Sequence, residues 1–229
     1  MDIAHYFRCC LNCGSLFPIR NTFLCGACWH QVDADRSKTK SQRVRRVATG
    51  KLEALTLWNW IPDKNDALSV MLAALKGWNG AKEWEFLARG MLTQRLNLAG
   101  QWNSDIEQGV DQSLIIPAPS LRPVAQDHAQ NLAKELARLL QLPMLPVLYK
   151  PRVLNSEGET SHQRGRTRFA RQNVFIKKRE NFSHLDLSKS RVILIDDVLT
   201  TGETAAACIE ALSPLKTYEI WCLAQRALL

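Results

Sequence analysis

The sequence predicts an α/β protein in which a mostly parallel sheet carries helices on both faces and follows a small cysteine-rich module. From Leu52 onward, short aliphatic runs alternate with segments of helical periodicity, which is typical of a parallel sheet with helical crossovers. Two Cys-x2-Cys pairs fall before the first of these runs. At 229 residues, the chain is long enough for one standard domain and a small module.

Each expected element has a local signal. Strands are short aliphatic or aromatic runs, expected at residues 52–61, 113–119, 145–149, 191–196 and 218–224. Helices have apolar residues three or four positions apart, expected at residues 66–75, 84–96, 127–140 and 203–212. The second of these helices is expected to bury Trp84, Leu87, Ala88, Met91, Leu92 and Leu96. Cys208 and Cys222 fall within a helical and a strand pattern, and both are expected in the core.

The two Cys-x2-Cys pairs are separated by eleven residues. Tetrahedral zinc takes four thiolates at about 2.3 Å, and each pair supplies two of them from one tight turn. Four protein ligands leave no open coordination position, so the expected ion is structural and not catalytic. The predicted ligands are Cys10, Cys13, Cys25 and Cys28.

Two other residues compete for a place in this site. Cys9 is adjacent to Cys10 and is an alternative ligand in its place. His30 is a weaker alternative, because imidazole nitrogen also binds zinc. Disulfides are not expected, because they are rare in a reducing compartment and no secretory signal is visible.

The predicted domains are a zinc-ribbon module at 1–32, a basic linker at 33–51 and the α/β domain at 52–229. The net charge of +8 is concentrated in two segments. Residues 36–51 contain seven Lys/Arg and no acid, and residues 150–179 contain nine Lys/Arg against two acids. Such basic segments suit phosphate-bearing ligands or nucleic acid, although a solvated linker explains the first of them equally well.

The segment VILIDDVLTTGET, residues 192–204, combines a buried strand, two aspartates and a small turn before a helix. Ligands of open parallel sheets bind beyond the carboxyl ends of the strands, where Asp196 and Asp197 are expected. The backbone amides that begin the following helix favour an anion, and Gly202 leaves room for it. Two carboxylates can accept hydrogen bonds from a vicinal diol. The segment therefore predicts a site for a ribose 5-phosphate.

All thirteen of these residues resemble the phosphoribosyl pyrophosphate (PRPP) signature of type I phosphoribosyltransferases. Joined to a four-cysteine amino end, without a glutamine-hydrolysing domain, the chain resembles the ComF family of competence-associated, amidophosphoribosyltransferase-like proteins. The segments IIPAPSLRP and GETSHQRGRTRFARQNVF are similar to segments of that family, as is Leu75-Lys76-Gly77. The chain departs from the family pattern in carrying VAQDH, residues 124–128, where the family has Arg-Gly-Phe-Asn-Gln.

The resemblance implies a type I phosphoribosyltransferase fold for the α/β domain, with PRPP bound together with Mg²⁺. In that chemistry pyrophosphate leaves C1 of the ribose and a nitrogen nucleophile attacks. Asp196 and Asp197 are the implied catalytic residues, and residues 155–168 form the implied lid. The implied PRPP-binding residues are Arg122, Asp196, Asp197, Val198, Leu199, Thr200, Thr201, Gly202, Glu203 and Thr204.

Two classes of function fit this reading. The first is an enzyme that transfers phosphoribose to a nitrogen acceptor. The second is a non-catalytic protein that binds PRPP or single-stranded DNA and acts with partners in DNA uptake during natural transformation, as the resemblance implies. The expected DNA contacts are Arg43, Arg45 and Arg46, but no aromatic residue lies among them to stack on bases.

The expected location is the cytoplasm. No run of about 18 apolar residues is present, so a membrane-spanning segment is not expected. The first residues, MDIAHYFRCCLNCG, lack the long apolar stretch of a secretory signal.

Overall fold

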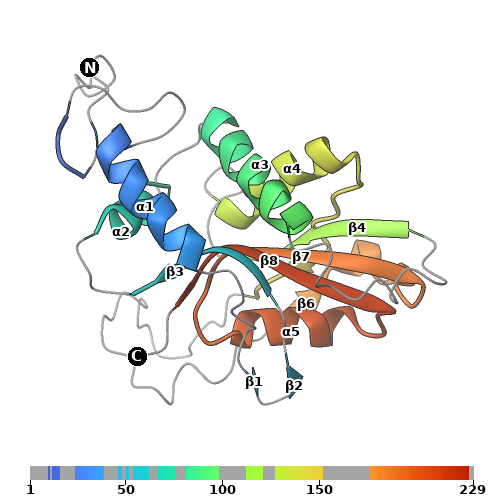
Figure 1. Cartoon of the computed structure of the whole chain (residues 1–229). Helices are drawn as coiled ribbons and strands as arrows, with labels where there is room; N and C mark the ends of the chain where they lie inside the picture. The colour runs from blue at the N-terminus through green and yellow to red at the C-terminus, as the bar shows by residue number, and fades with distance from the viewer. Residues whose placement is uncertain are drawn as a thin grey trace, which may run out of the picture.

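The computed structural model describes residues 10, 12–15, 24–38, 46–47, 50–51, 54–61, 66–75, 81–97, 112–120, 127–151 and 176–226. Its centre is a four-stranded, wholly parallel sheet in the order β3-β8-β7-β4 (Figure 1). The strands of this sheet are β3 (Ala54–Trp60), β4 (Gln112–Pro117), β7 (Ser190–Leu199) and β8 (Thr217–Arg226). The predicted α/β class and the parallel sheet are therefore confirmed.

Helices cover both faces of the sheet (Figure 1). One face packs against α1 (Gly26–Lys38), α2 (Ala67–Leu75), α3 (Ala81–Asn97) and α4 (His128–Leu140). The other face packs against α5 (Glu203–Leu212), which occupies the residues that the sequence predicts. Side chains alternate between the two faces of a strand. In β7, Ile193 and Ile195 accordingly belong to the first core, and Val192 and Leu194 to the second.

Two expectations about apolar segments are confirmed only in part. Within residues 145–149 only β5 (Leu148–Tyr149) is a strand, and it does not belong to the main sheet. It pairs antiparallel with β6 (Lys177–Lys178), and the short 3-10 helix η5 (Glu180–Phe182) follows. Leu96, expected in the core, is 74% exposed because it lies in the last turn of α3. Cys208 and Cys222 are buried as predicted.

The helix α1 links the cysteine-rich module to the sheet. It runs on to Lys38, within the segment that the sequence assigns to a linker, and a hairpin of β1 (Arg46–Val47) and β2 (Gly50–Lys51) follows. The ring of Trp29 packs edge-on against Trp58 of β3 and Phe86 of α3, at centroid distances of 6.3 and 5.1 Å. The module therefore shares a hydrophobic core with the α/β domain.

A buried ion-pair network ties α3 to the sheet at Glu219 of β8. The carboxylate accepts hydrogen bonds from Arg95 of α3 at 3.2 and 3.3 Å, from Arg191 of β7, and from the Trp221 indole at 2.8 Å. Burial opposes ionisation, but the Arg191 hydrogen bond prevails and lowers the pKa of Glu219. The ionised carboxylate thus holds together elements that are far apart in the sequence.

Glu219→Ala is expected to lower the free energy of unfolding by about 1–3 kcal/mol, because it leaves the partly buried guanidinium groups of Arg95 and Arg191 without this partner. The lowered pKa makes this contribution complete above the pKa of the unfolded state, and it is lost as the pH falls through the folded-state value. Urea unfolding from pH 7 to pH 3 measures the effect. The free energy of unfolding should differ most between wild type and Glu219→Gln near pH 7, and this difference should become smaller in acid. A difference that is the same at every pH would contradict the assignment of an ionised Glu219.

No helix in the described part of the chain is long and apolar enough to cross a membrane.

Candidate functional site

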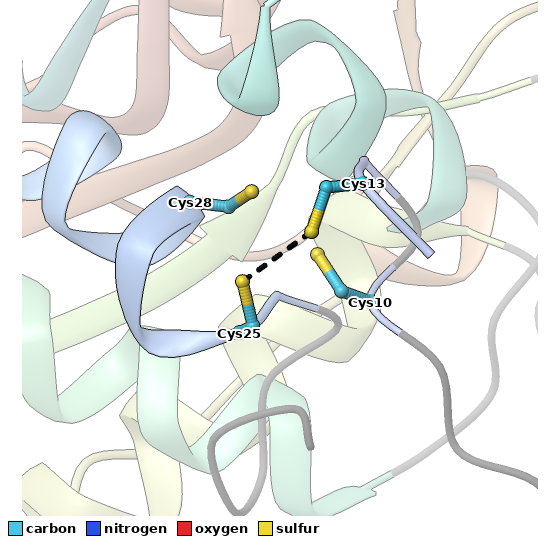
Figure 2. A group of neighbouring side chains, drawn as sticks. All are labelled: Cys10, Cys13, Cys25 and Cys28. Carbon is cyan, nitrogen blue, oxygen red and sulfur yellow. Dashed lines mark hydrogen bonds between the residues drawn. The ribbon is translucent and has the colours of Figure 1, made fainter. Parts of the chain in front are cut away.

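Four cysteine sulfurs converge between the amino-terminal turn and the start of α1. The Sγ atoms of Cys10, Cys13, Cys25 and Cys28 all lie within 4.8 Å of one another. Figure 2 shows the four side chains directed toward a common centre. A tetrahedron with metal–sulfur bonds of about 2.3 Å has edges of about 3.8 Å. The observed 3.5 Å between Cys13 and Cys25 Sγ is close to that edge, so the cluster can bind a metal ion.

Local backbone structure brings each pair together. The first pair lies on a turn in which the Gly14 amide donates to the Cys10 carbonyl at 2.8 Å. Gly14 has φ +75°, a conformation that glycine adopts without strain. In the second pair, Cys25 directly precedes α1 and Cys28 lies in its first turn. The amino end of a helix favours negative charge, which suits two thiolates there.

The cluster consists of free cysteines that are partly shielded from water. Cys10, Cys25 and Cys28 are buried, and Cys13 is exposed. The Asn12 side-chain amide donates to Cys28 Sγ at 3.3 Å and so orients one ligand. Among the described residues no other group of His, Cys, Asp or Glu has metal-binding geometry, so His30 is not part of the cluster. The alternative ligand Cys9 lies outside the described residues.

The aspartate pair lies where β7 extends beyond its neighbour β4. Pairing with β4 ends at Pro117 and Ile195, whereas pairing with β8 continues to Leu199. Strand β7 is therefore longer than predicted, and Asp196 and Asp197 are strand residues past the carboxyl end of β4. Each carboxylate accepts a hydrogen bond from the next backbone amide, at 2.8 Å in both cases.

The two carboxylates belong to opposite faces of β7. Asp197 follows Ile193 and Ile195 on the face covered by α4, where its Oδ2 lies 2.9 Å from Nδ1 of His128. Asp196 follows Val192 and Leu194 on the face covered by α5, where burial and, second to it, the nearby Asp196 carboxyl raise the pKa of Cys208. Adjacent aspartates thus have different surroundings.

These surroundings give the two aspartates opposite tendencies to ionise. Burial, reinforced by the charge of Asp197, raises the pKa of Asp196 well above its usual range. Burial also opposes ionisation of Asp197, but the His128 hydrogen bond prevails and lowers its pKa. Asp196 therefore holds a proton more readily than Asp197, whereas the sequence alone suggests two equivalent charged acceptors.

A short turn connects β7 to α5. Thr200 and Thr201 are exposed, and Gly202 is buried at the amino end of α5. Gly202 has φ 82° and provides no side-chain cap for the helix. The hydroxyl of Thr201 accepts from the Glu203 amide at the limit of hydrogen-bond distance, 3.5 Å. The turn thus combines exposed hydroxyls with the amino end of a ten-residue helix.

Several predicted site residues lie outside the described part of the chain. These are Arg122 and the lid at 155–168. The basic residues Arg43 and Arg45 lie outside it as well. Their roles, including contact with single-stranded DNA, stay predictions.

Sequence analysis did not identify His128, the partner of Asp197. It is 5% exposed, stands at the first position of α4 and packs on the Trp84 ring with a centroid distance of 5.9 Å. Asp127 caps the same helix by accepting from the Gln130 amide. The signal in the sequence was VAQDH, residues 124–128, which contains both residues.

No protein-family model matches the chain, and a search of curated proteins finds none that matches it.

Proposed function

We propose that the chain binds PRPP and transfers its phosphoribose to a nitrogen acceptor, as type I phosphoribosyltransferases do. The observation that carries the proposal is the position of the Asp196-Asp197 pair. It lies past the carboxyl end of β4 and directly before the exposed turn that begins α5. Open parallel sheets bind ligands at this edge, and among the described residues no strand pairs with β7 on its β4 side beyond Ile195.

The chemistry of the turn suits a sugar phosphate. Amides at the amino end of α5 and the hydroxyls of Thr200 and Thr201 are donors for the 5-phosphate. The Asp197 carboxylate is an acceptor for a ribose hydroxyl, and the Asp196 carboxyl, whose pKa is raised by burial, offers a second polar group beside it.

The residues present fit magnesium only as a companion of the ligand. Among the described residues, Asp196 and Asp197 do not belong to a group with metal-binding geometry. Magnesium is commonly held by one or two carboxylates together with substrate phosphates, where it offsets charge on the leaving pyrophosphate. The chain's own groups would bind and orient the ribose, which is the larger part of catalysis without a covalent enzyme intermediate.

For the cysteine cluster we propose a structural zinc ion. Four thiolates that are close enough to coordinate one ion tetrahedrally are typical of zinc sites without a catalytic role. The burial of three of the sulfurs supports a closed site. The metal would fix the amino-terminal turn against α1 and, through α1, against β3.

Calorimetric titration of the purified chain with PRPP and Mg²⁺ tests the proposed function, followed by assay of pyrophosphate release with a panel of amines and nucleobases. Saturable binding with release in the presence of one acceptor is the expected result. Binding without release would support the non-catalytic alternative. Absence of PRPP binding in metal-replete, folded protein would overturn the proposal.

A further inference from the structure

His128 is held in one orientation from several sides. Its backbone begins α4, and Asp127 caps the helix through the Gln130 amide at 3.2 Å. Its ring lies nearly parallel to the Trp84 indole, with an interplanar angle of 19°. Both side chains are almost fully buried, at 5% and 2% exposure. A ring held in this way gives its nitrogen atoms fixed directions.

One of those nitrogens is directed at Asp197, near the carboxyl end of β7. Nδ1 lies 2.9 Å from Oδ2 of Asp197, across 69 residues of sequence. The second oxygen, Oδ1, accepts from the Val198 amide at 2.8 Å. Both oxygens of Asp197 therefore have protein partners, which fix the plane of the carboxylate. The side chain of Asp197 is still 30% exposed, so a ligand can reach it.

We propose that His128 is a positioning residue of the phosphoribose site, which holds Asp197 so that its remaining lone pairs meet a ribose hydroxyl. The inference rests on the proposed function, because it concerns the same site. It goes further in assigning a role to His128, which is 5% exposed and contacts Asp197 directly. Outer partners that orient a binding group commonly change affinity or activity by about 10- to 100-fold when removed.

The Trp84 indole contributes a flat face to the packing of His128. Its Nε1 atom is buried and has no hydrogen-bond partner among the described residues, so the indole acts on His128 through stacking. The extended flat surface of the indole is what the imidazole packs against.

Two substitutions separate orientation from packing. His128→Phe retains a flat ring against Trp84 but removes the donor to Asp197. His128→Asn places an amide nitrogen near the position of Nδ1 and retains the donor. The probes are ribose 5-phosphate and its 2,3-dideoxy analogue, which retains the phosphate but lacks both hydroxyls. Their dissociation constants are measured by calorimetry for wild type and both variants.

We expect wild type to bind ribose 5-phosphate more tightly than the dideoxy analogue. In His128→Phe the ratio of the two dissociation constants should fall by about tenfold, or 1.4 kcal/mol. His128→Asn should retain most of the wild-type ratio, and affinity for the dideoxy analogue should be alike in all three proteins. If His128→Phe retains the wild-type preference for ribose 5-phosphate, or if both variants lose it equally, the positioning role is overturned but the proposed function is not. Absence of binding by wild type would overturn the proposed function and this role with it.

A measurement on the unsubstituted protein covers the case in which His128→Phe does not fold. The ring N–H signal of His128, observed by nitrogen-edited NMR of the full chain, should shift on addition of ribose 5-phosphate and stay in place with the dideoxy analogue. If neither ligand shifts the signal although calorimetry shows that ribose 5-phosphate binds, the positioning role is overturned.

Discussion

Cys28→Ser is expected to release the bound zinc and to destabilise the whole α/β domain as well as the amino-terminal turn. Structural zinc contributes several kcal/mol to folding, and serine is a poor substitute for thiolate. The destabilisation extends beyond the amino-terminal turn, because buried residues of the module belong to the same hydrophobic core as β3 and α2. These residues are Cys10, Leu24, Cys25, Cys28 and Val32. A loss of about 3–5 kcal/mol corresponds to a fall in Tm of roughly 10 °C or more for a chain of this size.

Elemental analysis and thermal unfolding followed by tryptophan fluorescence measure the two parts of this prediction. His30→Ala is the matched control, because His30 lies in α1 and is exposed but is not part of the cluster. It should retain one zinc per chain and a nearly unchanged Tm. Absence of zinc from wild type purified without chelator would refute the metal assignment. Zinc loss without a fall in Tm would refute the coupling between the module and the sheet.

Asp196→Asn combined with Asp197→Asn is expected to weaken PRPP binding by roughly a hundredfold or more. Hydrogen bonds to charged groups contribute about 1.5–3 kcal/mol each, and each 1.4 kcal/mol is a factor of ten. The single variants should differ, because the structure gives the two carboxylates different surroundings. Asp197→Asn alters the partner of His128 and removes the carboxylate with the lowered pKa, whereas Asp196→Asn replaces the carboxyl group whose pKa is raised by burial. The larger effect is therefore expected from Asp197.

PRPP titration of the three variants beside wild type measures this order, with Tm as the control for folding. Thr201→Val is a useful companion, because it removes one hydroxyl from the turn and should weaken PRPP and ribose 5-phosphate alike. Gly202 is unsuited to such a test, since any side chain at φ 82° strains the backbone. Wild-type affinity in the double variant would show that the aspartates do not contact the ligand.

The elements with strong local signals were predictable. Helix α5 and the buried part of β7 follow from an unbroken aliphatic run, a Thr-Thr-Gly turn and helical spacing, all within residues 192–212. The cysteine cluster was equally predictable from the sequence, because two Cys-x2-Cys turns need little besides a metal to bring four sulfurs together. These features are encoded by neighbours in the sequence.

The parts that could not be predicted depend on contacts between distant segments. Helix α1 is mostly polar, and only its packing through Trp29 against Trp58 shows that it belongs to the domain. The pairing of β5 with β6 joins segments about thirty residues apart, which no local pattern reveals. The same holds for His128, whose partner Asp197 is distant in the sequence. A histidine at a helix start has many ordinary explanations until its neighbour is known.

The inner position of β8 has a consequence for biosynthesis. Ala54 of β3 pairs with Ile220 of β8, and no other strand in the described part of the chain pairs with β3. At about 5–20 residues per second on a ribosome, β3 waits roughly 10–30 s for that partner. Meanwhile its apolar side chains, Leu55, Leu57 and Trp58, are open to association with other nascent chains. The cysteine-bearing turn and helix α1 are made before β3, and α1 packs on it, so they can cover its apolar side chains during that interval.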